Sequence, residues 1–486
     1  MSLSSALSIA QAALRNTARQ TTVLSRNVSD ASNPDYTRRI AVLSTTAPGA
    51  RIVDIQRAAN QQLFRSNLAA LSSYEGQNTL MAGLDSLALQ VNGTDNTSSP
   101  AALLGDLQEA LHLYSTQPHN RTMAENAVEA ARQLVISLNQ GAQALQNSRV
   151  DADRRIATEV DELNTLLSDF DAANKEVVQG TQAGRDVNDA LDKRESLLKK
   201  ISEKLPVSTI ARPGNDMVII TGDGTMLYET TPRKVTFQPI AGYSATTTGN
   251  AVYIDGVPVE GGAGGNTSAT GRIAAFLQLR DTVAPAMQSQ LDEIARGLIT
   301  TFAEKDPSGI DPDMAGLFTW SGGPALPTGG VLENGIAGSI SVNPAVDFTN
   351  GGDPVLLRDG GVNGAAYVWN LTGDASYTGL LNDIGDRLNG SMAFDLSAGL
   401  GDSATLNDYA ASSISWLEGL RQQAFNASET KSAMMTHTGE ALSNATGVNI
   451  DEEMSLLLDL EHSYQASARL LSAVDEMLSN LLSAVR

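Results

Sequence analysis

Apolar residues recur at alternating spacings of four and three positions at both ends of the chain. In the first segment the repeat runs through Leu3, Leu7, Ala10, Leu14, Thr17, Thr21, Leu24 and Val28. In the last segment it runs through Leu457, Leu460, Tyr464, Ser467, Leu471, Val474, Leu478, Leu481 and Val485. Such spacing is typical of helices that pack along a seam against partner helices. The pattern predicts a helix at each end, and we call these two sets of residues the terminal seam.

Two apolar chain ends require a partner surface, because chain ends are usually polar and frayed. One possibility is an intramolecular antiparallel hairpin of the two helices. The other is packing among neighbouring copies, which would bury more surface, since Thr17, Thr21 and Ser467 weaken a lone hairpin. On the second interpretation, both ends should be partly disordered in the monomer and become ordered on assembly.

The stretch NVSDASNPDYTRR, residues 27–39, interrupts the first repeat. Asn33 precedes Pro34, which disfavours a helical conformation at Asn33, and Pro34 and Asp35 suit the centre of a turn. The helix should therefore end before Pro34, and the following RRIAVLST should be extended. We call Asn33, Pro34, Asp35, Tyr36 and Arg38 the turn motif. Tyr36, Arg38 and Arg39 could dock between copies or could be plain surface residues.

The interior of the chain alternates between segments with helical periodicity and segments rich in β-forming residues, glycine or proline. Helical periodicity marks residues 61–90, 101–115, 124–177 and 272–304, and the long third stretch holds heptad seams of its own. From Pro206 the sequence is rich in β-forming residues, with TGDGT as a hairpin turn. Glycine- and proline-rich sequence, either β or irregular, later runs to about residue 400. Helices then resume to the end.

These textures predict a mainly α, elongated multidomain protein with an inserted β-rich part. The terminal helices should pair as a coiled coil beside a helical-bundle middle domain, with an outer β domain. The predicted domains are residues 1–50 with 446–486 (terminal helices), 51–205 with 271–306 and 400–445 (helical bundle), and 206–270 with 307–399 (β-rich).

Charge and composition narrow the choice of partners. The 486 residues carry a net charge of −22, which disfavours nucleic acid and anionic membranes, because both are polyanions. The absence of cysteine excludes disulfides and thiolate metal sites. No run of about 18 apolar residues is present, and the N-terminus lacks the basic region of a secretory signal. Export, if it occurs, should follow another route.

No motif predicts catalysis, a cofactor or a metal site. The four histidines lie outside any HExxH or Cys/His array, and TGDGT is not followed by the GK[ST] of a phosphate loop. DPSGIDPDMAG lacks the spacing of an EF-hand and is interpreted as an Asp/Pro/Gly turn cluster. The acidic pairs Glu452–Glu453 and Asp475–Glu476 are interpreted as solvated helix faces. We therefore expect a non-enzyme.

Several segments resemble the flagellar hook-associated protein 1 family. SNPDYTRR is similar to the N-x-P-G-Y-[ST]-R signature of flagellar axial proteins, and GVNIDEEMSLLLDLEHSYQASARLLSAVDEML is similar to their C-terminal ending. NRTMAENAVEAARQLVISLN and DVNDALDKRESLLKKISEKLPV resemble this family's inner helices. Asp35 stands where the family usually has Gly, so a type I turn is expected, and Glu461 stands where Gln is common.

The resemblance implies a structural adaptor at the junction of hook and filament, outside the cell. It implies export through the flagellar type III apparatus after a cytosolic chaperone has held the C-terminal region. The implied partners are copies of the chain, the hook protein and hook-associated protein 3.

The nearest alternative is another axial protein, such as a hook or distal-rod protein, which should lack long helices between residues 100 and 205. Two alternatives of other classes are a secreted adhesin and an enzyme carried by residues 206–400.

Overall fold

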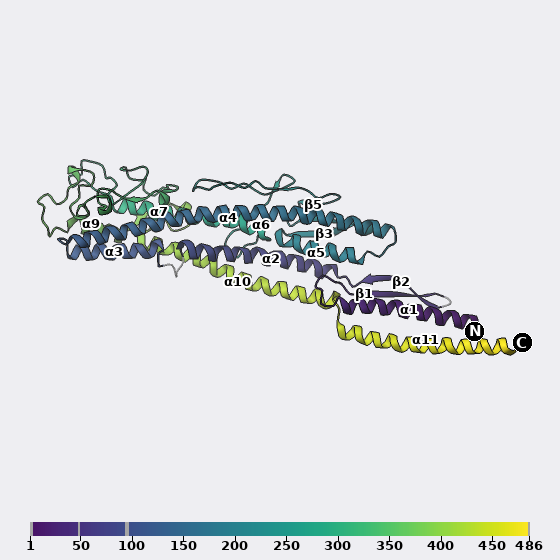
Figure 1. The fold of residues 1–486 in the computed structure, drawn as a ribbon. Coiled ribbons are helices and arrows are strands. Elements are labelled where there is room, and N and C mark those ends of the chain that lie inside the picture. Colours follow the sequence, from purple (N-terminus) through teal and green to yellow (C-terminus); the bar gives the residue numbers. More distant parts are fainter. Residues whose placement is uncertain (1–2, 47–48, 93–96, 485–486) are drawn as a thin grey trace. The chain divides into compact units, whose positions relative to one another are not determined.

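The computed structural model describes residues 3–46, 49–92 and 97–484 (Figure 1). The chain divides into two compact units, each built from separate stretches of sequence. Unit 1 comprises residues 1–74, 162–235 and 430–486, and unit 2 comprises residues 75–161 and 236–429. Helices α2 (Gln61–Leu87), α4 (Arg121–Gln182) and α10 (Leu406–Thr446) contribute residues to both units.

Unit 1 combines helices with two small antiparallel sheets. Its own helices are α1 (Leu3–Ser29), α5 (Asn188–Lys204) and α11 (Ile450–Ala484). Its strands are β1 (Arg39–Thr46), β2 (Gly49–Arg57), β3 (Val207–Ala211), β4 (Met217–Thr221) and β5 (Met226–Tyr228), paired as β1-β2 and β3-β4-β5. The predicted TGDGT turn joins β4 to β5, and Gly224 supplies the positive φ of 89° that this turn needs.

Unit 2 is built around helix α7 (Ala284–Thr301). Its own helices also include α3 (Pro100–Thr116), α6 (Arg272–Gln278), the π-helical turn η3 (Leu279–Val283), α8 (Leu356–Asp359) and α9 (Gly379–Asn389). Its strands are short: β7 (Tyr253–Ile254), β8 (Val257–Pro258), β9 (Phe318–Thr319), β10 (Ser341–Val342), β11 (Met392–Ala393) and β12 (Ser403–Ala404), while β6 (Val235–Thr236) falls at the boundary of the units in sequence. The hydrophobic core joins α7 to α2, α3, α4 and α10.

The internal heptad positions of α4 form its buried face, as the periodicity predicts. Leu134, Leu138 and Leu145 have no exposed surface in unit 2, and Ile156 and Leu163 have none either. A helix of 62 residues keeps this pattern without interruption. The apolar stripe, rather than helix propensity alone, therefore accounts for its length.

Residues 307–399 are largely irregular, which is one of the two courses that the sequence leaves open for this range. The strands β9, β10 and β11 have two residues each, whereas the prediction holds better for the β3-β4-β5 sheet. Glycine, proline and asparagine are frequent in this stretch, and such residues favour turns. Buried carboxylates that bind the backbone of these loops take the place of a long strand ladder.

Buried acidic side chains of α7 hold the irregular segment by its backbone. Asp292 accepts hydrogen bonds from the N–H groups of Gly335 and Ala337 at 2.8 and 2.9 Å. Glu293 accepts one from the N–H of Asp395 at 2.9 Å and pairs with buried Arg296 at 2.7 Å. These bonds satisfy backbone donors that a strand ladder would otherwise satisfy.

Glu304, just beyond α7, has the same role. Its carboxylate accepts hydrogen bonds from the N–H groups of Gly361, Val362 and Asn363 at 2.6 to 2.8 Å, and it is only 4% exposed. Asp306 accepts in the same way within its own loop, from Ser308 and two further N–H groups.

The two compact units do not follow the three predicted domain ranges. The terminal helices group with residues 51–74 and 162–235, which the sequence assigned to the bundle and the β-rich part. The three-domain division stays a prediction.

Candidate assembly site

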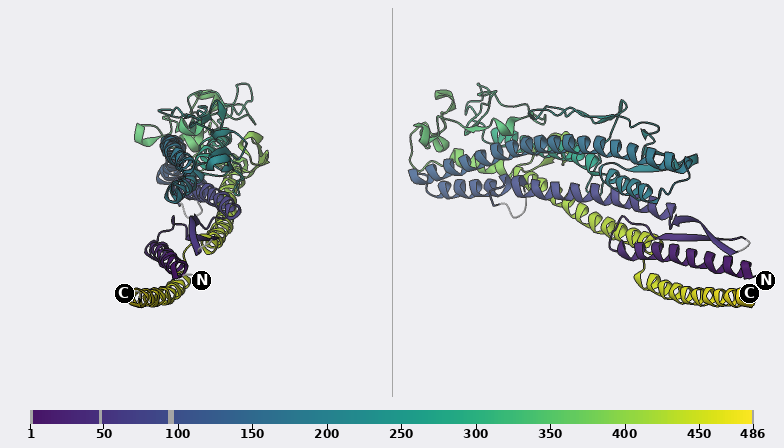
Figure 2. Two further views of the ribbon diagram at one scale, coloured as in Figure 1. Left: turned by 90° about the vertical axis from the view of Figure 1, so that its right-hand side faces the viewer. Right: turned by 45° about the vertical axis from the view of Figure 1, so that its right-hand side comes forward.

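Helix α11 packs antiparallel against α1 within unit 1 (Figures 1 and 2). On α1 the buried members of the terminal seam are Ala10, Thr17 and Leu24, and the half-buried members are Leu3, Leu7, Leu14, Thr21 and Val28. On α11, Val474 is buried, and the half-buried members are Leu457, Leu460, Ser467, Leu471 and Leu478. Tyr464 and Leu481 are exposed, and Val485 lies outside the described residues. The role of the terminal seam between copies stays a prediction.

Helix α11 leaves much apolar surface uncovered in the single chain. Among its 35 residues, all of them described, only Glu453 and Val474 are buried. Side chains that are between 42% and 68% exposed are Ile450, Met454, Leu456, Leu458, Tyr464, Leu470, Met477, Leu481 and Leu482. Apolar surface gathered on one element marks a site of interaction more often than scattered apolar residues do.

The turn motif ends α1 as the sequence predicts. The helix stops at Ser29, and Tyr36 donates its N–H to the carbonyl of Asn33 at 3.1 Å across a turn centred on Pro34 and Asp35. Asp35 does not have a positive φ, in agreement with a type I turn.

The Asp35 side chain ties this turn to α5. Its carboxylate accepts hydrogen bonds from the Ser196 hydroxyl at 2.7 Å and the Lys199 ammonium at 3.3 Å. Partial burial raises the pKa of Asp35, but the Ser196 bond and the charge of Lys199 outweigh it, so the pKa is lowered overall. The carboxylate thus gives Asp35 a structural use that Gly could not have.

Four side chains then join the turn motif to the start of α11, and we call them the Glu453 lock: Asn27, Tyr36, Arg38 and Glu453. Asn27 accepts a hydrogen bond from the Tyr36 hydroxyl at 2.8 Å and donates to the Glu453 carboxylate at 2.9 Å. Arg38 donates to the other oxygen of Glu453 at 2.6 Å. Asn27 and Glu453 are fully buried. Burial also raises the pKa of Tyr36 to about 12, so its hydroxyl stays a donor.

The Glu453 lock corrects the interpretation of Glu452 and Glu453 as one solvated face. The Glu452 side chain is 60% exposed, as expected, but that of Glu453 is 0% exposed. Sequence reasoning also missed Asn27, although a polar residue near the buried stripe of α1 is a signal that could have been followed. The docking of Tyr36, Arg38 and Arg39 between copies stays a prediction, but Tyr36 and Arg39 are already buried in the single chain.

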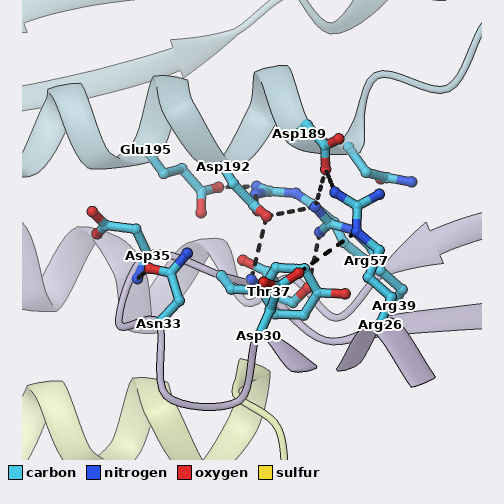
Figure 3. Close-up of polar contacts among 12 residues, drawn as sticks. Arg26, Asp30, Asn33, Asp35, Thr37, Arg39, Arg57, Asp189, Asp192 and Glu195 are labelled. Atoms are coloured by element: carbon cyan, nitrogen blue, oxygen red, sulfur yellow. Dashed lines mark hydrogen bonds and ion pairs between the residues drawn. The ribbon is translucent and has the colours of Figure 1, made fainter. Parts of the chain in front are cut away.

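A cluster of arginines and carboxylates fastens α1 and the β1-β2 hairpin to α5 (Figure 3). Arg26 pairs with Asp189 at 2.7 Å, and Arg39 pairs with Asp192 at 2.5 Å. Arg57 pairs with Asp192 at 2.8 Å and with Glu195. Partial burial raises the pKa of Asp189, but its bonds to Arg26 and Arg39 lower it overall. Because the charges alternate in sign, the cluster orders the hairpin without leaving a buried charge unpaired.

No group of three or more His, Cys, Asp or Glu in residues 3–46, 49–92 and 97–484 could hold a metal ion. Over the same residues, no helix is both long and apolar enough to cross a bilayer. In DPSGIDPDMAG, the Asp306 carboxylate is already occupied by hydrogen-bond donors of its own loop.

Comparison with known proteins places the chain among flagellar proteins. The family model "Flagellar basal body rod FlgEFG protein C-terminal" matches residues 441–484, a segment that contains α11. The family model "Flagellar hook-associated protein FlgK helical domain" matches residues 56–317. The first match indicates a flagellar axial protein. With the second match spanning more than half of the sequence, the chain belongs to the flagellar hook-associated protein FlgK family.

Two curated relatives are similar over nearly the whole length. Flagellar hook-associated protein 1 of Bacillus subtilis is 22% identical over 98% of this chain and 96% of the relative. Flagellar hook-associated protein 1 of Escherichia coli is 22% identical over 98% of both chains. The solved structure of the flagellar hook junction protein FlgK from Burkholderia pseudomallei is 16% identical, with a TM-score of 0.41 over 54% of this chain and 47% of that one. The family is one of structural flagellar components, which gives this chain a flagellar location.

Proposed function

We propose that this chain is the adaptor at the junction of hook and filament, and that copies assemble through α1 and α11. The observation that carries the proposal is the uncovered apolar surface of α11. This helix already lies on α1, yet its exposed side chains include Met454, Leu458 and Met477. A flagellar axial protein with such a helix has its own neighbouring copies as the natural cover.

The mechanism follows from helix packing. Within one copy, α1 and α11 pair as a coiled coil along the terminal seam, and the Glu453 lock fixes where that pair begins. Copies then stack head-to-tail around an axis, a heterologous contact that closes into a ring or continues as a helix. Each contact between copies buries apolar side chains, and this burial stabilises the assembly by about 25 cal/mol for each Å² of apolar area removed from water.

The proposed partners follow from the family. The hook protein would lie below the assembled copies, and hook-associated protein 3 above them. Before export through the flagellar type III apparatus, a cytosolic chaperone would hold the exposed apolar side chains of α11. The long helices α4 and α5 between residues 121 and 204 favour this role over that of a hook or distal-rod protein.

Replacing an exposed apolar residue tests assembly without disturbing the single chain. We expect cells whose only copy carries Met477→Asp to export the protein but to bear bare hooks, with flagellin lost to the medium. Met477 is 51% exposed, so the charge is tolerated in the monomer and excluded from the contact. The matched control is Ser479→Asp, which adds the same charge at an exposed polar position two residues away.

Electron microscopy of the cells, with the exported protein measured in the medium, gives the result. Normal filaments on Met477→Asp cells would contradict assembly through this surface. Cells that lack the protein altogether should also have bare hooks. If they instead kept their filaments and lost attachment, the adaptor role would be wrong and an adhesive role would replace it.

A further inference from the structure

The two terminal helices carry opposite charges, and no ion pair joins the two helices within residues 3–29 and 450–484. Helix α1 contains three arginines and no acidic residue, although the whole chain has a net charge of −22. Helix α11 contains seven acidic residues and one arginine. Charges of opposite sign on two neighbouring helices would be expected to form ion pairs with each other. The contacts of each charged residue show whether they do.

Two of the three arginines of α1 have no partner in the described part of the chain. Arg26 pairs with Asp189 of α5, whereas Arg15 and Arg19 are exposed and make no ion pair or hydrogen bond within residues 3–46, 49–92 and 97–484. At 100° per residue, each lies about 160° around α1 from the buried Thr17 of the terminal seam. They therefore occupy the exposed side of α1, opposite its buried face.

The acidic residues of α11 are also divided between paired and exposed ones, and the one arginine of α11, Arg469, is exposed about 140° around the helix from the buried Val474. Glu453 is buried in its lock, and Glu452 reaches Arg38 at 3.4 Å. Glu461 and Glu476 are exposed and lie about 140° and about 160° around the helix from the buried Val474. Glu461 makes only a local hydrogen bond with Gln465, at 3.2 Å.

The outward sides of the two helices are also complementary in shape. The exposed residues around Arg15 and Arg19 are mostly small, among them Ser8, Ala18 and Thr22, and the large apolar side chain exposed among the described residues of α1 is Ile9, at 38%. The outward side of α11 carries the larger Met454 and Leu458. A helix with large apolar side chains can approach a helix with small ones closely, and long arginine side chains can then reach carboxylates at the rim of the contact.

We propose that the Arg15–Arg19 side of α1 binds the Glu461 and Glu476 side of α11 from a neighbouring copy. The proposal rests on the proposed function, because it names a contact within the assembly, and it adds a charge-pairing surface to the apolar one. Glu461 and Glu476 are about 22 Å apart along the helix at about 1.5 Å per residue. The arginine pair thus meets one of them in any one register, and the test changes both.

Charge reversal on each helix, alone and mixed, tests this contact between copies. One variant carries Arg15→Glu and Arg19→Glu, and the other carries Glu461→Lys and Glu476→Lys. Each variant alone sets like charges against each other, so we expect a fall of about tenfold or more in the fraction of cells with filaments. When both variants are expressed in one cell, every contact between unlike copies regains opposite charges, and filaments should return.

Two controls separate the possible failures. Arg15→Lys with Arg19→Lys keeps the charge and should leave filaments at the wild-type level, and the amount of each variant in the medium reports export. If wild-type protein did not restore filaments to cells that lack it, the proposed function would fail. If it did, and either reversed variant alone also restored them fully, only the charge-pairing contact would be wrong. Reversed variants that fail both alone and together would also overturn the contact, because pairing between copies requires the mixture to work.

Discussion

Helices α7 and α11 are opposite solutions to the burial of a helix. Of the 18 residues of α7, 14 are buried, and of the 35 residues of α11, only two are buried. Both helices have apolar stripes, so an apolar stripe alone does not decide whether a helix is buried within the single chain. Helix α7 is therefore a core element of unit 2, whereas α11 leaves much of its apolar surface exposed in the single chain.

Helix α7 also buries more charged residues than α11 does. Helix α7 buries Asp292, Glu293 and Arg296, and each of them bonds to the backbone of a distant loop. Helix α11 buries one charge, Glu453, at its first turn. Charges inside α7 therefore organise a fold around it, and the one inside α11 anchors a helix at one end only.

The largest difference in stability is expected when one leucine of α7 and one leucine of α11 are each truncated to alanine. Leu298 of α7 has no exposed surface, so Leu298→Ala should lower the free energy of unfolding by about 2–5 kcal/mol. Leu470 of α11 is 49% exposed, and Leu470→Ala should change it by less than about 0.5 kcal/mol. Chemical denaturation of the purified monomer measures both. Equal losses of unfolding free energy in the two variants would mean that α11 is packed in the monomer as fully as α7.

Removal of the Glu453 carboxylate should have the next largest effect. Glu453→Ala leaves Asn27 and Arg38 without their buried acceptor, so we expect a loss of about 2–4 kcal/mol in the local stability of the α11 junction. Hydrogen exchange should become faster over the first turns of α11 and over the turn motif. The neighbouring variant Glu452→Ala is the control, because its exposed side chain should contribute less than about 0.5 kcal/mol. Unchanged exchange in Glu453→Ala would remove the anchoring role.

The charge on Asp292 should make unit 2 less stable as the pH rises. Burial raises the pKa of Asp292 to about 6, although hydrogen bonds from Gly335, Ala337 and Gln288 act to lower it. The folded state thus binds this proton more tightly than the unfolded state, whose value is near 3.8. Its stabilising effect is complete below the unfolded value and is lost as the pH rises through about 6, by about 3 kcal/mol at about 1.36 kcal/mol per pKa unit.

Asp292→Asn provides the comparison for this pH dependence. It removes the titrating group, so the stability of the wild type relative to the variant should fall between about pH 4.5 and about pH 7. Thermal unfolding at a series of pH values measures the difference. A difference that stayed constant over this interval would show that Asp292 does not titrate there.

The smallest effect is expected at Asp35. Asp35→Ala removes the contacts with Ser196 and Lys199, and the carboxylate side chain is 43% exposed, so the loss should be about 1 kcal/mol. The lowered pKa of Asp35 means that its contribution is present above the unfolded value and is lost as the pH falls through the folded value. In denaturation at a series of pH values, the advantage of the wild type over the variant should be complete at about pH 7 and should decrease as the pH falls below the unfolded value of 3.8.

The sequence predicted the features that depend on local pattern. The heptad repeat of α4 marked Leu138 and Leu163 as buried, and both have no exposed surface. Asn33 and Pro34 located the end of α1, because their backbone preferences act over a few residues. The family was also recognisable from motifs at both ends of the chain.

Features that depend on distant partners were missed. Glu453 lies 426 positions from Asn27, and no local pattern distinguishes it from the exposed Glu452 beside it. Glu304 bonds to an N–H group 57 positions away, so the irregular course of residues 307–399 could not be separated from β structure by composition. Burial of a charge is decided by tertiary contacts, and periodicity does not report those contacts.

The way Glu304 holds its loop bears on how this surface can evolve. The carboxylate binds main-chain N–H groups, which every amino acid except proline possesses, so these hydrogen bonds do not depend on which side chains the loop carries. The same freedom extends to Ile310, whose N–H bonds to Asp306 while its side chain is 84% exposed. Exposed side chains on these loops can therefore be replaced while the main-chain hydrogen bonds to the buried acidic residues stay the same.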